Sequence, residues 1–118
     1  MALVYNSKSR REDVYKPLVK ALELAAEAVP FDVMVVCAYR NKSMQDKAFK
    51  EGKSKLKWPN SAHNKAPARA VDICPYVDKM LLWTDEAKFD AFRAELSKRI
   101  KLNPKIKWDM GHMEVECG

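Results

Sequence analysis

Glycine, cysteine and histidine are scarce in this 118-residue sequence, which has 3 Gly, 3 Cys and 2 His. So little glycine argues against a collagen-like or glycine-rich flexible chain. The cysteines, Cys37, Cys74 and Cys117, are odd in number and form no C-x-x-C pair, which argues against a disulfide framework. No apolar run approaches the ~18 residues that span a bilayer. With 47% hydrophobic and 32% charged residues, the composition indicates a globular chain that buries its own core.

Positive charge exceeds negative charge along the chain. The 22 Lys and Arg against 16 Asp and Glu give a formal net charge of +6, which predicts affinity for polyanions without choosing among them. The first residues, Met1 to Asn6, turn polar before the apolar core of a signal peptide could form. We therefore expect synthesis in the cytoplasm, no membrane insertion, and outside help for any exit.

Apolar periodicity predicts three helices. The first covers 17–29, where apolar residues recur at three- and four-residue spacing until Pro30 stops the helix. Ser43 can cap a short second helix that ends at Gly52. Thr84 begins a third helix with apolar residues at helical spacing.

Short apolar runs predict strands between these helices. A long loop, 53–67, contains two prolines and has no sustained period. The expected strands are 31–38, 69–76 (stopped by Pro75), 105–108 and 113–116, the last two around a turn at Gly111. Together these elements predict a single α+β domain over 1–118, in which about three helices pack with a small antiparallel sheet.

Two histidines and an aspartate suggest a metal site. Asp72 lies inside the apolar strand 69–76, where an unpaired carboxylate would cost several kcal/mol. An ion pair with Arg69 or Arg40 would remove that cost, and so would a divalent cation. With His63 and His112, Asp72 would make a three-ligand site with a position left for water, which is typical of catalytic zinc.

Two acidic residues accompany His112 in the sequence. A turn at Gly111 can bring the Asp109 carboxylate beside His112 without making it a ligand. There it could accept a proton from the attacking water and pass it to a leaving amine. Glu114 shares a strand face with His112 and is a candidate hydrogen-bond acceptor for its imidazole.

Three motifs occur in order: Ser61-Ala62-His63, Ala70-Val71-Asp72-Ile73 and Asp109-x-x-His112-x-Glu114. They resemble the S-x-H, A-x-D and D-x-x-H-x-E motifs of the VanY-like zinc peptidases. That group includes D-alanyl-D-alanine carboxypeptidases and the L-alanyl-D-glutamate peptidases that serve as phage endolysins. Upstream, CAYRNKSMQ from Cys37 to Gln45 resembles their strand-exit segment G-Y-R-S-x-x-x-Q, with Ala38 in place of glycine.

The resemblance implies a role for each matching residue. His63, Asp72 and His112 would bind one Zn²⁺ at the sheet face of a hedgehog/D-Ala-D-Ala peptidase-like fold. Asp109 would be the catalytic acid/base. Arg40 would bind a substrate carboxylate or stabilise the developing oxyanion, and its alternative is a structural ion pair with an acidic neighbour.

Several further residues have more than one interpretation. Ser61 and Gln45 are candidates to contact the substrate or to support the residues that do, although Ser61 could equally be a turn former. The three tryptophans could line a cleft, but a buried or half-buried position in a small core is the commoner outcome. Cys74 would share the strand face of Asp72, and we expect a packed free thiol rather than a ligand.

The function that the resemblance implies is zinc-dependent cleavage of peptidoglycan stem peptides by a phage endolysin of the L-alanyl-D-glutamate endopeptidase type. We expect a monomer without a separate cell-wall-binding domain and without a nucleic-acid partner, which reaches the wall through a separate holin. One alternative is a D-alanyl-D-alanine carboxypeptidase. An alternative of another class is a non-catalytic basic module that binds cell wall or nucleic acid.

Overall fold

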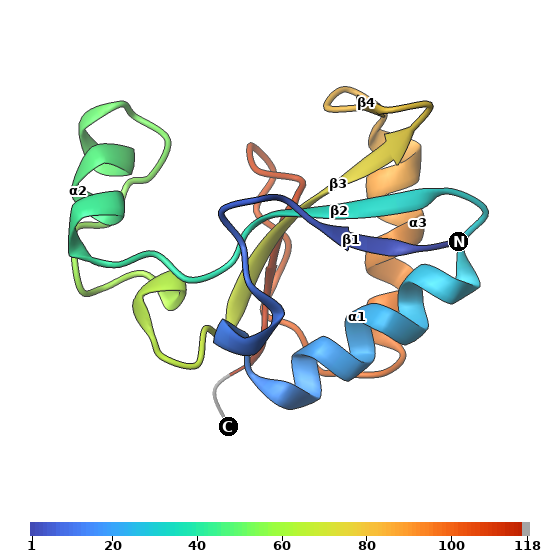
Figure 1. The fold of residues 1–118 in the computed structure, drawn as a ribbon, viewed down its shortest axis with the longest axis horizontal. Coiled ribbons are helices and arrows are strands. Elements are labelled where there is room, and N and C mark those ends of the chain that lie inside the picture. The colour runs from blue at the N-terminus through green and yellow to red at the C-terminus, as the bar shows by residue number, and fades with distance from the viewer. Residues whose placement is uncertain (117–118) are drawn as a thin grey trace.

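The computed structural model describes residues 1–116 and shows three α-helices with one five-stranded sheet (Figure 1). The helices are α1 (Lys16–Ala28), α2 (Lys42–Lys50) and α3 (Glu86–Ser97). The strands are β1 (Leu3–Tyr5), β2 (Asp32–Cys37), β3 (Ala70–Val77), β4 (Met80–Leu81) and β5 (His112–Glu114). Short 3-10 helices cover Arg11–Asp13 and Ala62–Asn64. The predicted α+β class is confirmed, and no helix in the described part is long and apolar enough to cross a membrane.

The sheet is antiparallel except at one edge. Its strand order is β1-β2-β3-β4, and β5 pairs with β3 beside β4. The pairs β2–β3, β3–β4 and β3–β5 are antiparallel, as predicted, whereas β1 runs parallel to β2. A parallel pair needs a crossover connection, and α1 supplies it here. The sequence prediction missed β1 and β4, which have only three and two residues.

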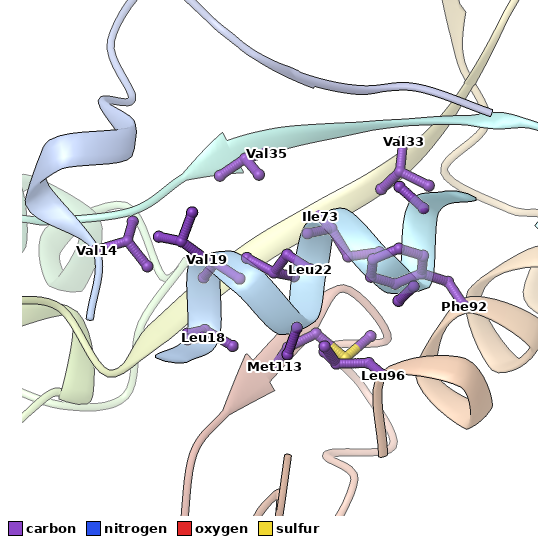
Figure 2. Close-up of a cluster of buried hydrophobic side chains, with 14 of the residues drawn as sticks. Val14, Leu18, Val19, Leu22, Val33, Val35, Ile73, Phe92, Leu96 and Met113 are labelled. Carbon is purple, nitrogen blue, oxygen red and sulfur yellow. The ribbon is translucent and has the colours of Figure 1, made fainter. Parts of the chain in front are cut away.

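One face of the sheet carries the hydrophobic core. The helices α1 and α3 both cover this face, and Figure 2 shows their side chains meeting those of β2, β3 and β5. The labelled residues of this cluster are Val14, Leu18, Val19, Leu22, Val33, Val35, Ile73, Phe92, Leu96 and Met113. Because successive strand residues point to opposite faces, Asp72 points away from the core that its neighbours Val71 and Ile73 enter. The sheet face away from α1 and α3 is therefore available for polar chemistry.

The second helix lies apart from the other two, where β2 ends (Figure 1). It begins after Asn41, whose side chain accepts the backbone N–H of Met44 at 2.9 Å, so the prediction of a Ser43 cap is wrong. Asparagine and serine both cap helices well, and Asn41 is the cap here because the helix begins at Lys42.

Two strand predictions also need correction. Pro75 does not stop β3, which continues to Val77, because the Pro75 carbonyl still accepts the N–H of Leu82 at 2.9 Å. The segment 105–108 forms no strand, because β5 pairs with β3 instead of folding back on this segment.

Candidate active site

A capped 3-10 turn holds His63. The Ser61 hydroxyl accepts the backbone N–H of His63 at 3.2 Å, and the backbone N–H of Ser61 donates to Asn64 Oδ1 at 3.0 Å. The backbone N–H of Arg40 donates to the carbonyl of His63 at 2.8 Å, which ties the turn to the end of β2. Sequence reasoning missed Asn64, although Ser61-x-x-Asn64 has the spacing of a capping box.

Strand register brings Asp72 between two other candidate residues. Its partner on β2 is Cys37, and its partner on β5 is His112. The row Cys37–Asp72–His112 therefore crosses the sheet on adjacent strands. His63 reaches the same place from the loop, since its Nε2 lies 3.3 Å from Asp72 Oδ1.

Each imidazole uses one ring nitrogen on an oxygen acceptor. His63 Nδ1 lies 2.7 Å from the carbonyl oxygen of Ala38, and His112 Nε2 lies 2.9 Å from Glu114 Oε1. Carbonyl and carboxylate oxygens only accept, so these two nitrogens carry hydrogens. A neutral ring then has its lone pair on the other nitrogen.

Both remaining nitrogens face the same carboxylate oxygen. His63 Nε2 and His112 Nδ1 lie 3.3 and 3.2 Å from Asp72 Oδ1. His63 is 2% exposed, and its Nε2 has no hydrogen-bond partner among the described residues. Two lone pairs aimed at one carboxylate repel it unless positive charge lies between them. These residues therefore fit a bound cation.

The pKa shifts have the same origin. Burial by itself lowers the pKa of His63, but Asp72 raises it to about 10. Burial also lowers the pKa of His112, and hydrogen bonds to Asp72 and Glu114 raise it by more. Burial raises the pKa of Asp72, while the two imidazoles bring it well below its usual range. Two imidazole protons thus balance the ion-free site, and a divalent ion would displace them.

Two groups of side chains among residues 1–116 have the geometry to hold a metal ion. One is Cys37, His63 and Asp72, and the other is Asp72, Asp109 and His112; within each group the ligand atoms lie within 4.8 Å of one another. Both groups include Asp72, and each contains one of the two histidines. The predicted set of His63, Asp72 and His112 spans both groups, and Cys37 is an addition that the sequence prediction did not include.

A tight turn places Asp109 beside His112. The backbone N–H of His112 donates to the Asp109 carbonyl at 3.2 Å, and the N–H of Ile73 donates to the Gly111 carbonyl at 2.9 Å. A Cβ at Gly111 would overlap the Ile73 carbonyl oxygen, so only glycine lets this turn approach β3 so closely. Burial and then the charge of Asp72 raise the pKa of Asp109.

Arg40 and Gln45 both contact the turn that carries His63, since Asn64 Nδ2 donates to the Arg40 carbonyl and to Gln45 Oε1, each at 3.1 Å. Arg40 Nη2 lies 3.3 Å from Asp72 Oδ2, so the ion pair considered in the sequence analysis is present. Arg40 Nη1 donates to Gln45 Oε1 at 3.4 Å. Gln45 is 0% exposed, so its side chain is enclosed by protein and contacts the residues around the site.

These residues surround a small cavity of about 110 Å³. Its wall contains the candidate residues Arg40, Ser61, His63, Asp109, His112 and Glu114, together with loop residues Lys53–Leu56 and with Ile106 and Trp108. Trp108 is 58% exposed and lines this cavity, so it follows the cleft alternative, and Trp83 is 52% exposed.

Cys74 takes no part in the described site. Cys74 is buried, as expected of a packed thiol, and burial raises its pKa to about 11. Cys117 lies outside the described residues.

The fold is a small α+β domain that carries its candidate site on the sheet face away from α1 and α3. The structure resembles the L-Ala D-Glu endopeptidase ChiX of Serratia marcescens with a TM-score of 0.75 and 17% identity, over 96% of this chain and 90% of that chain. No curated protein matches the sequence. The family model of the phage L-alanyl-D-glutamate peptidases matches residues 1–114, and the chain belongs to that family.

Family membership confirms the predicted class of activity. The chain is a peptide hydrolase of the L-alanyl-D-glutamate type that acts on peptidoglycan. This favours the endopeptidase over the D-alanyl-D-alanine carboxypeptidase and over the non-catalytic binding module.

Proposed function

We propose that the hydrolysis depends on one zinc ion held by His63, Asp72 and His112. The observation that supports this most directly is that each imidazole donates from one ring nitrogen to an oxygen acceptor and directs the other nitrogen toward Asp72. Two imidazoles and one carboxylate suit zinc, and three protein ligands leave a position open for chemistry.

We prefer His112 to Cys37 as the third ligand because the two side chains lie near different nitrogens of the His63 ring. The Cys37 sulfur lies 4.0 Å from His63 Nδ1, whose hydrogen already serves the Ala38 carbonyl. His112 instead directs its Nδ1 to the oxygen of Asp72 that His63 Nε2 also faces. Cys37 therefore contacts the ring nitrogen that carries a hydrogen rather than the nitrogen that faces Asp72.

In this arrangement Asp109 moves the proton. Bound zinc would polarise the scissile carbonyl and lower the pKa of a water to about 7. Asp109 would accept the proton of the attacking water and give it to the leaving amine of D-glutamate. Its raised pKa supports this role, because a carboxyl group that titrates nearer neutral pH both accepts and returns a proton readily.

The surrounding residues orient the reacting groups. Arg40 would donate hydrogen bonds to the developing oxyanion, and its contact with Asp72 places its guanidinium next to the proposed ion. Glu114 would fix the tautomer of His112. The Ser61 oxygen accepts the N–H of His63 and leaves its own hydrogen free to donate to substrate.

We further propose that residues 1–118 act as one monomeric catalytic domain without a nucleic-acid partner. The hydrophobic core between the sheet and helices α1 and α3 supports the assignment of one domain. Release to the wall would depend on a separate holin.

The test is digestion of purified peptidoglycan with untreated protein, chelator-treated protein and protein restored with zinc. Mass spectrometry of the products should show new D-glutamate amino termini that disappear with chelator and return with zinc. Cleavage that survives complete removal of the metal would refute the zinc site. Free D-alanine as the product would move the assignment to the carboxypeptidase.

A further inference from the structure

A lysine-rich loop forms one wall of the catalytic cavity. The loop follows α2 at Gly52, and its residues Lys53–Leu56 line the cavity. Trp108 and Asp109 also line the cavity. The Lys55 ammonium lies 4.8 Å from the centre of the Trp108 ring.

The three cations that line the cavity differ in their partners. Arg40 is paired with Asp72 at 3.3 Å, and Lys53 is paired with Glu51 at 3.4 Å. Lys55 forms no ion pair within the described residues, and its charge rests on the indole face. An ammonium on an aromatic face is held in place but keeps its N–H donors free for an anion.

A buried side chain fixes the position of this lysine. Gln45 Nε2 donates to Ser54 Oγ at 2.9 Å and to the carbonyl of Leu56 at 2.7 Å, so hydrogen bonds hold the loop on both sides of Lys55. Gln45 Oε1 accepts the side-chain N–H of Asn64 at 3.1 Å. Gln45 thus joins the lysine loop to the turn that carries His63, and it acts as a positioning residue.

The substrate provides an anion at a fixed distance from the scissile bond. A glutamate residue in a peptide has two carboxyl groups, of which one continues the chain and the other is spare. In an L-alanyl-D-glutamate bond the spare group lies a few bonds from the scissile nitrogen. It is a carboxylate when free and a neutral carboxamide when amidated.

We propose that Lys55 binds the spare carboxylate of D-glutamate and makes the enzyme select stem peptides in which that group is not amidated. This rests on the proposed function and adds a specificity residue to it. Arg40 is paired with Asp72 and would face the developing oxyanion. The spare carboxylate of D-glutamate therefore needs another cation. Lys55 is the cation of the cavity wall that has no acidic partner in the described chain.

The test uses two synthetic stem peptides that differ only in a carboxylate or a carboxamide on D-glutamate. Lys55→Gln should lower kcat/KM for the carboxylate peptide about 5-fold or more and leave the carboxamide peptide unchanged. Lys55→Arg should keep the preference, and higher salt should weaken it. Lys57→Gln is the matched control, because this substitution removes the same charge from the same loop. Lys57 contacts the Phe49 ring and does not line the cavity.

Equal losses on both peptides, or an equal loss in Lys57→Gln, would overturn the assignment. Calorimetry on Asp109→Asn separates this failure from failure of the proposed function, since it measures peptide binding without turnover. In that background Lys55→Gln should weaken binding of the carboxylate peptide alone by a similar factor. Should the wild type cleave neither peptide, the proposed function fails, and this binding difference still decides the role of Lys55.

Discussion

Replacing Gly111 by alanine tests how the catalytic turn is mounted on the sheet. The new Cβ would overlap the carbonyl oxygen of Ile73 and lie 3.4 Å from its carbonyl carbon and its nitrogen. All three are backbone atoms of a core strand, so the turn must move instead. That movement stretches the hydrogen bond from the Ile73 N–H to the Gly111 carbonyl, which is 2.9 Å in the native chain.

The expected loss of stability combines two effects. A buried N–H deprived of its acceptor costs about 1–3 kcal/mol, and forcing a methyl group into a filled site costs a similar amount. We therefore expect Gly111→Ala to lower the free energy of unfolding by about 3 kcal/mol and the Tm by roughly 10 °C. Because the turn carries both Asp109 and His112, zinc retention should fall as well.

Gly52 supplies the matched control. It has a φ of +75°, but an added Cβ would meet nothing within 4 Å. Gly52→Ala should therefore cost only about 1 kcal/mol for the left-handed backbone, with zinc retained. The assay is thermal unfolding by circular dichroism together with metal analysis. Equal stability of the two variants would refute the close-approach argument.

Three further predictions concern the metal and the protons of the site. His63→Ala and His112→Ala should lose bound zinc, whereas Cys37→Ser should keep one zinc per chain by atomic absorption; zinc loss in Cys37→Ser alone would make the cysteine a ligand. Asp109→Asn should keep zinc and lose about 10²–10⁴-fold in kcat, and a near-normal rate would remove Asp109 as the base. In chelated protein the pKa of His63 is about 10, against 6.5 for an ordinary histidine. The protonated His63 therefore contributes fully to the free energy of unfolding below about pH 6.5, and this contribution is lost as the pH rises through 10. The Tm of chelated protein should fall over that range while zinc-loaded protein does not show this loss, and parallel curves would contradict the assignment.

Sequence patterns predicted the parts of the fold that local chemistry determines. The amphipathic spacing of α1 and the apolar run of β2 indicate their structure without tertiary information. Asp72 was identifiable because a carboxylate inside an apolar strand needs a partner. β1 was missed because three residues give no usable period, and its structure depends on pairing with β2.

The features that sequence could not give depend on tertiary contacts. Nothing in the sequence distinguishes Gln45, which is fully buried, from an exposed glutamine, because its burial results from the loop that folds over it. The approach of Cys37 to His63 likewise depends on where β2 ends relative to the 3-10 turn. The segment 105–108 has the alternation of a strand, but it lacks a partner strand in the described chain.

The row Cys37–Asp72–His112 makes correct strand pairing a condition for the proposed metal site. Because side chains alternate between faces, a slip of one residue in β3 would turn Asp72 into the helix-covered core and bring an apolar neighbour to the ion. A chain that folds with the wrong register would therefore have neither a sound core nor a metal site. With the proposed zinc site, zinc retention would report on correct folding of this small enzyme, and misfolded molecules should carry no residual wall-degrading activity.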